Sequence, residues 1–117
     1  MEKKYVIVIQ SGVNDMGRAY HGLFYGIELY RAGYEVEIYF DGTGTQLIKE
    51  FAQPKHPFNS VYVEALEVGI IKGACGYCAN YLKTKEEIES SEVNVLNEEK
   101  HFSLTDRLEK GYFPLIL

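Results

Sequence analysis

The sequence predicts an α/β fold of three layers, in which a mostly parallel five-stranded sheet lies between helices. Apolar, strand-like segments alternate along the chain with segments of helical periodicity, the pattern that parallel strands with helical crossovers produce. The first such segment, residues 5–9, is apolar or aromatic throughout, as expected for a strand covered on both faces. At 117 residues, the chain is expected to form one domain, residues 1–117.

Five segments have the composition of strands, and six have the spacing or capping of helices. We expect strands at residues 5–9, 35–40, 69–74, 93–96 and 112–117. We expect helices at residues 20–33, 46–52, 61–68, 77–82, 84–91 and 103–111. The continuous apolar character of the first strand places it at the centre of the predicted sheet.

Local signals support the earlier elements in order. The first helix follows a turn-rich loop, carries apolar side chains at helical spacing and ends near Gly33, a residue suited to a left-handed C-terminal position. The second strand alternates charged with apolar residues, which predicts one wetter face. Pro54 and Pro57 keep the next loop from being helical throughout.

The end of the chain carries clearer signals. Ser103, followed three residues later by Asp106, resembles a capping box with Asp in place of Glu. Gly111 is placed to end the helix that this box begins. Pro114 has no backbone N–H to donate, so the closing strand is expected at an edge of the sheet.

Charge and hydropathy exclude several classes of function. Seventeen acidic against twelve basic residues give a formal net charge of -5, so direct binding of nucleic acid is not expected. No apolar run approaches the roughly 20 residues of a membrane span, and the apolar segment near the start is too short for a signal-peptide core. We therefore expect a cytoplasmic protein that does not contact membranes.

The two cysteines of the chain, Cys75 and Cys78, lie together where a predicted strand leads into a helix. The N–H groups and dipole at a helix start favour thiolate over thiol. In a reducing compartment, such a pair points to redox, sulfur-handling or metal-binding chemistry rather than to a permanent disulfide. Both are candidate catalytic residues. We expect Cys75 to be the more reactive and Cys78 the more buried.

Three loops are expected to meet at the carboxyl edge of the sheet, where open α/β folds bind ligands. They follow the first three strands, at residues 11–17, 41–45 and 74–78. The first two are rich in glycine but match neither a dinucleotide-binding fingerprint nor a P-loop, so tight turns are the preferred interpretation.

The histidines leave two alternatives open. Zinc could be bound by the cysteine pair with His56 or His101 only if distant loops met, so we expect no metal and no cofactor. A nucleophilic cysteine–histidine pair could use His21, His56 or His101, and nothing in the sequence selects among them.

Tyrosine usage predicts a homo-oligomer. The chain contains ten tyrosines and no tryptophan, and tyrosine is enriched at subunit interfaces. Gly22 and Gly26 share one face of the first helix, where a second backbone could approach closely.

The chain as a whole resembles the DsrE/DsrF-like family of small sulfur-relay proteins. The resemblance is carried by Gly-Ala-Cys-Gly-Tyr-Cys-Ala-Asn at residues 73–80, by Tyr-Phe-Asp-Gly at 39–42 and by the closing turn at 108–112. It implies a flavodoxin- or Rossmann-like arrangement of layers and assembly into oligomers. It also implies that Cys75 accepts sulfane sulfur as a persulfide from a donor protein and passes it to an acceptor protein. Many members of the family carry a residue other than cysteine at the position of Cys78.

Three functions therefore remain as hypotheses. The first is a cytosolic sulfur carrier that uses Cys75. The second is a non-catalytic oligomeric module of the same fold that binds a small ligand. The third is a dithiol oxidoreductase in which Cys75 and Cys78 cycle through a disulfide.

Overall fold

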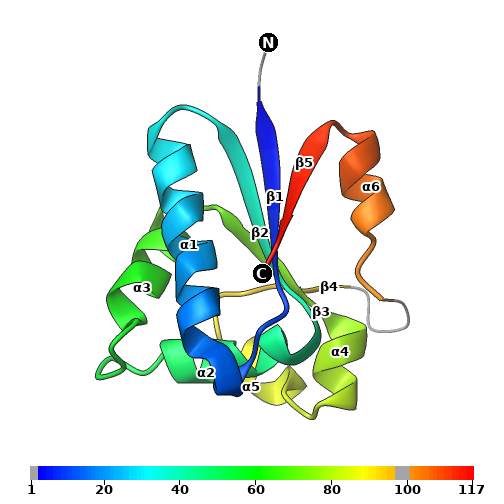
Figure 1. The fold of residues 1–117 in the computed structure, drawn as a ribbon. Helices are drawn as coiled ribbons and strands as arrows, with labels where there is room; N and C mark the ends of the chain where they lie inside the picture. Colours follow the sequence, from blue (N-terminus) through cyan, green and yellow to red (C-terminus); the bar gives the residue numbers. More distant parts are fainter. Residues whose placement is uncertain (1–2, 97–100) are drawn as a thin grey trace.

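The computed structural model describes residues 3–96 and 101–117. Its five strands form one sheet in the order β4-β3-β2-β1-β5, and every neighbouring pair is parallel (Figure 1). The strands are β1 Lys4–Ile9, β2 Glu35–Phe40, β3 Ile71–Cys75, β4 Val95–Leu96 and β5 Tyr112–Ile116. The predicted α/β class and the parallel sheet are confirmed.

Helices cover the two faces of the sheet unequally. They are α1 Met16–Arg31, α2 Leu47–Phe51, α3 Asn59–Glu67, α4 Gly76–Tyr81, α5 Lys85–Glu89 and α6 Leu104–Glu109, with 3-10 turns η1 Val13–Asp15 and η2 Gly42–Gln46. The helices α1, α2 and α3, which follow β1 and β2, pack on the face of the sheet that carries the larger core. The return to β5 places α6 opposite α1 and α3 (Figure 1). Within the described part of the chain, no helix has the length and apolar character needed to span a membrane.

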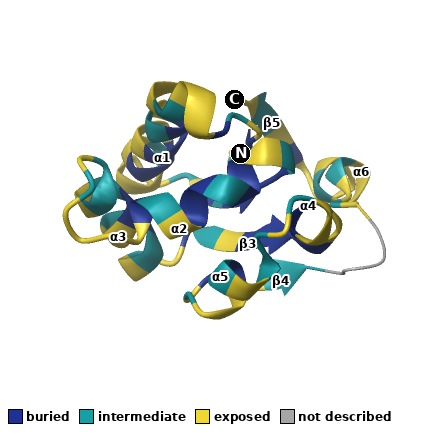
Figure 2. Cartoon of the chain, turned by 90° about the horizontal axis from the view of Figure 1, so that it is seen from below, coloured by how far each residue is buried: buried dark blue, intermediate teal, exposed yellow. Residues whose placement is uncertain are grey.

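The larger core lies on the face covered by α1, α2 and α3, and the buried strands run through the middle of the molecule (Figure 2). Its largest fully buried side chains include Phe40, Phe51 and Tyr62. The opposite face has a smaller cluster beside α6, formed by Val6, Val8, Tyr39 and Tyr112. Phe102 and Leu104, from the segment before α6 and from α6 itself, pack against this smaller cluster.

Two expectations about packing were wrong. The central strand is β2 rather than β1, because only β5 lies beyond β1. Gly22 and Gly26 face the sheet of their own chain and not a second subunit. A Cβ atom at Gly26 would lie 2.6 Å from Ile38 Cδ1, and one at Gly22 would lie 3.0 Å from Ile9 Cγ1. Their small size lets α1 approach the sheet closely.

The predicted helix ends are confirmed. Gly33 follows α1 with a φ of 92°, and Gly111 follows α6 with a φ of 90°, conformations that favour glycine. The Asp106 N–H donates a hydrogen bond of 3.2 Å to Ser103 Oγ, so Ser103 caps α6 as its sequence position indicates. The closing strand β5 lies at an edge of the sheet, as predicted from Pro114.

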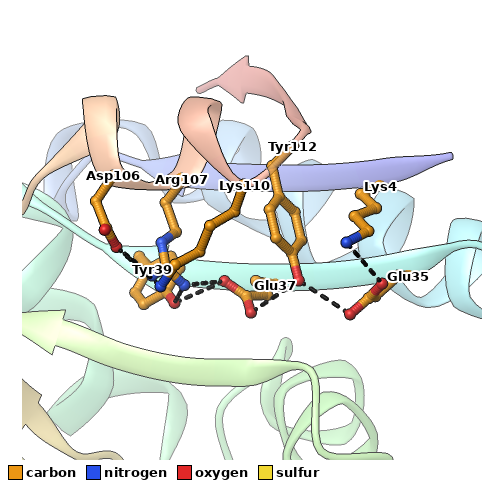
Figure 3. A network of polar contacts seen from close by, with 8 residues as sticks. All are labelled: Lys4, Glu35, Glu37, Tyr39, Asp106, Arg107, Lys110 and Tyr112. Atoms are coloured by element: carbon orange, nitrogen blue, oxygen red, sulfur yellow. Dashed lines mark hydrogen bonds and ion pairs between the residues drawn. The ribbon is translucent and has the colours of Figure 1, made fainter.

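The wetter face of β2 carries a polar network beneath α6 (Figure 3). Glu37, whose side chain is 14% exposed, accepts hydrogen bonds from Tyr39 at 2.7 Å, Arg107 at 2.8 Å and Tyr112 at 3.0 Å. Burial by itself would raise the pKa of Glu37, but these hydrogen bonds outweigh it and hold the pKa below its usual value. The network anchors α6, and with it the preceding segment, to the sheet.

Replacing Glu37 with glutamine should lower the free energy of unfolding at pH 7 by about 2 kcal/mol. The mostly buried guanidinium of Arg107 then keeps Asp106 but loses its charged partner on the sheet. Because the pKa of folded Glu37 is lowered, its contribution is present above the unfolded carboxyl pKa of about 4.3 and is lost as pH falls through the lower folded pKa. Urea unfolding at neutral and acid pH measures this difference.

The exposed Glu109 of α6 provides the matched control. Glu109→Gln should change the free energy of unfolding by less than about 0.5 kcal/mol. Equal losses in the two variants, or a Glu37→Gln loss that does not shrink in acid, would contradict the anchoring role of the network.

Candidate functional site

The first three strands end side by side, and the loops that follow them meet as predicted. Gln10 Nε2 donates a hydrogen bond of 3.0 Å to Asp41 Oδ2, and Thr43 Oγ1 donates one of 2.6 Å to the Gln10 carbonyl. The Cys78 thiol donates to Asp41 Oδ1 at 3.5 Å. Asp41, 2% exposed, therefore lies at the junction of the three loops.

Cys75 is the last residue of β3 and the N-cap residue of α4. It is 1% exposed. Its side chain makes no capping hydrogen bond to α4, so the expected contact with the helix start is not formed. The Phe102 backbone N–H instead donates to Cys75 Sγ at 3.3 Å. The sulfur thus accepts its hydrogen bond from the segment before α6.

Cys78 lies in the first turn of α4 and is 8% exposed, so the expectation that it would be the more buried cysteine was wrong. Cys75 is more enclosed because it pairs with Leu96 in the sheet and lies against Phe102. Burial and, next, the neighbouring Cys75 thiol raise the pKa of Cys78 well above its usual value. The raised pKa disfavours the thiolate form of Cys78.

Of the three histidines, His101 reaches the cysteines. Its Nε2 lies 3.1 Å from Asp41 Oδ1, and its ring contacts Tyr77 of α4. One ligand-type atom from each of Asp41, Cys75, Cys78 and His101 lies within 4.8 Å of the others. Loops far apart in the sequence therefore meet here, as the zinc alternative required.

The other two histidines are held in other contacts. His21 Nδ1 lies 2.8 Å from the Gly17 carbonyl on the exposed surface of α1. His56 Nδ1 accepts the Phe58 N–H at 3.0 Å, and its ring packs against Phe51. Neither belongs to the four-residue group around the thiols.

Sequence reasoning missed Asp41 and Phe102 as site residues. Asp41 carried a usable signal, because it directly follows a strand at the carboxyl edge of the sheet. Phe102 acts through its backbone N–H, a group that every residue except proline possesses, so its side chain type gave no signal.

A pocket of about 270 Å³ lies next to the site, between α6 and the sheet. It is lined by Tyr39, Leu96, His101, Phe102, Ser103, Asp106 and Arg107. His101 and Phe102 line this pocket and also belong to the site: His101 contacts Asp41, and the Phe102 N–H donates to Cys75 Sγ. Cys75 itself is buried and is not among the residues that line this pocket.

The arrangement permits three kinds of chemistry. A cysteine that accepts an N–H hydrogen bond on its sulfur can hold a thiolate or a persulfide. Two thiols this close can form a disulfide. Two thiols, an imidazole and a carboxylate within 4.8 Å also make a set of metal ligands.

Comparison with known proteins supports the fold. No model of a known protein family matches the sequence, and no curated protein matches it. A similar fold occurs in the solved structure of BT1422, a conserved protein of unknown function from Bacteroides thetaiotaomicron. The TM-score is 0.70 at 17% sequence identity, over 97% of this chain and 95% of that chain. At this identity, the similarity shows a shared α/β fold.

Proposed function

We propose that the protein is a sulfur carrier in which Cys75 holds sulfane sulfur as a persulfide. The observation that carries this proposal is the position of Cys75 at the carboxyl edge of the sheet, with the Phe102 N–H on its sulfur. The sequence resemblance to DsrE/DsrF-like relay proteins supports the same residue. A hydrogen bond donated to sulfur stabilises the anionic forms, both thiolate and persulfide.

The transfer conserves atoms and electrons. The Cys75 thiolate attacks the outer sulfur of a donor persulfide, and an S–S bond forms at Cys75 as the S–S bond of the donor breaks. The donor leaves as a thiolate with the electron pair. An acceptor thiolate then attacks the outer sulfur on Cys75, which restores the Cys75 thiolate. Neither step requires an external oxidant or reductant.

A carrier of this kind acts through partner proteins in the cytoplasm, and the surface beside the thiols suits such contacts. Tyr77 and Tyr81 lie one turn apart on α4 and are 50% and 79% exposed. Tyrosine is enriched at interfaces because it combines apolar area with a polar tip. We place the docking of the sulfur donor and acceptor on this side of the molecule.

The protein is also expected to be a homo-oligomer. Besides its high tyrosine content, the chain exposes Phe24 and Tyr25 on α1 and Phe113 on the edge strand β5. Burying such side chains between subunits removes apolar area from water. Light scattering at micromolar concentration should give a mass at least twice that of the 13.4 kDa chain. A monomer mass would refute this expectation.

The proximity of the two thiols favours a second candidate, a dithiol that releases sulfide. Cys78 would first have to lose its thiol proton, against its raised pKa, and would then attack the inner sulfur of the persulfide, which is Cys75 Sγ. A Cys75–Cys78 disulfide forms as the outer sulfur leaves as sulfide. The carrier would then be left oxidised and would need a reductant before the next cycle.

Intact mass after exposure to sodium polysulfide, with a chelator present and the excess removed, distinguishes these functions. A gain of about 32 Da supports the carrier, and a loss of about 2 Da supports the sulfide-releasing dithiol. No change in mass would overturn both and would leave a non-catalytic binding module as the better explanation.

A further inference from the structure

We infer that Asp41, Cys75, Cys78 and His101 form a binding site for one Zn²⁺ ion per chain. Three of the four residues are buried, and their ligand-type atoms lie within 4.8 Å of one another. They come from the end of β2, the junction of β3 and α4, and the segment before α6. This inference does not rest on sulfur transfer, although it uses the same thiols.

Two of the distances among these atoms are close to those of tetrahedral zinc, and all of them lie within 4.8 Å. Zinc bonds of about 2.3 Å to sulfur and about 2.0 Å to nitrogen or oxygen place the ligand atoms of a tetrahedron about 3.3 to 3.8 Å apart. Asp41 Oδ1 lies 3.5 Å from Cys78 Sγ and 3.1 Å from His101 Nε2. A zinc ion bound to Asp41 Oδ1, Cys78 Sγ and His101 Nε2 would replace the proton-mediated contacts that now join these atoms, and Cys75 Sγ would complete the four ligands.

The surroundings also fit a metal site, because the ligands are oriented by further hydrogen bonds. Gln10 Nε2 donates to Asp41 Oδ2, which leaves Oδ1 directed at the thiol and imidazole. The Phe102 N–H donates to Cys75 Sγ, as N–H groups do to metal-bound thiolates. His101, with a half-exposed side chain, provides a path for the ion to enter.

The donor set selects the class of metal. Two thiolates and an imidazole favour zinc over magnesium and calcium, which prefer oxygen ligands. Four protein ligands leave no open position for substrate, so the ion would join three segments of the chain rather than catalyse hydrolysis. Bound zinc would also protect both thiols from alkylation.

Titration of the reduced, chelator-treated chain with Zn²⁺ and with Co²⁺ tests the site. Native mass spectrometry should show one ion per chain. Co²⁺ should produce a thiolate-to-metal charge-transfer band and the intense visible bands of tetrahedral coordination. Absence of binding, or a cobalt spectrum without the thiolate band, would overturn the inference.

Variants of the two histidines provide the matched comparison. His101→Ala removes a half-exposed ligand without opening the core, and it should weaken zinc binding at least about tenfold. His21→Ala, on the exposed surface of α1, should leave the affinity unchanged. Circular dichroism checks that both variants are folded. Equal affinity in the His101→Ala variant and the unmodified chain would overturn the four-residue site.

The failure of one proposal can be told from the failure of the other. The metal titration contains no sulfur donor, and sulfur loading is measured in the presence of a chelator. A chain that binds zinc but gains no sulfur contradicts only the carrier function. A chain that gains sulfur but binds no metal contradicts only the zinc site.

Discussion

Replacing Cys75 with serine is expected to abolish sulfur loading, from about one sulfur atom per chain to none. A serine hydroxyl at the end of β3 still lies near the Phe102 N–H, but it is a far weaker nucleophile than a thiolate. Intact mass after polysulfide treatment measures the loss. Circular dichroism and urea unfolding check that the variant remains folded.

Cys78→Ser is the matched control, because it removes the other thiol of the same pair. It should still load about one sulfur per chain, since the proposed nucleophile is intact. Loading that is lost equally in both variants would contradict the assignment of the persulfide to Cys75. Loading retained in Cys75→Ser and lost in Cys78→Ser would reverse the roles of the two residues.

Replacing Gly44 with alanine should cause the largest loss of stability of the substitutions considered, about 3 kcal/mol or more. Gly44 is buried in η2, and a Cβ atom there would overlap the backbone carbonyl oxygen of Ile9 at the end of β1. Backbone cannot rotate away as a flexible side chain can, so the two segments must separate. The midpoint of thermal unfolding should fall by about 10 °C or more.

Gly17→Ala is the control for the general cost of adding a methyl group. A Cβ atom at Gly17, in the first turn of α1, would meet nothing within 4 Å. The substitution should stabilise the helix slightly, by less than about 1 kcal/mol. If Gly44→Ala unfolds at the same temperature as Gly17→Ala, the close packing of η2 against β1 is incorrect.

Much of the fold follows from local physical rules. The continuous apolar run of β1, the capping by Ser103 and the positive φ of Gly33 and Gly111 each depend on residues close in sequence. The convergence of the first three loops follows from parallel strands alone, because their carboxyl ends share one edge. Cys75 and Asp41 are therefore brought to one edge by pattern and topology.

The remaining parts of the site depend on long-range packing. His101 comes from a part of the chain without periodic pattern, and its approach to Asp41 depends on where α6 docks. That docking depends on Glu37 and Arg107, which are 70 residues apart. The alternation in β2 correctly predicts the polar face, but no local signal shows that α6 covers it. Cys75 is more buried than Cys78 because the segment before α6, which contains Phe102, lies against it.

The most direct test of the carrier function is whether the bound sulfur can be transferred. Cyanide attacks the outer sulfur of a persulfide, so the chain loaded with sulfur from polysulfide and freed of excess reagent should react to give thiocyanate. We expect about one thiocyanate per chain, the return of the intact mass to that of the reduced protein, and no thiocyanate from Cys75→Ser. A loaded chain that yields no thiocyanate, and instead releases sulfide with formation of a Cys75–Cys78 disulfide, would contradict the carrier function.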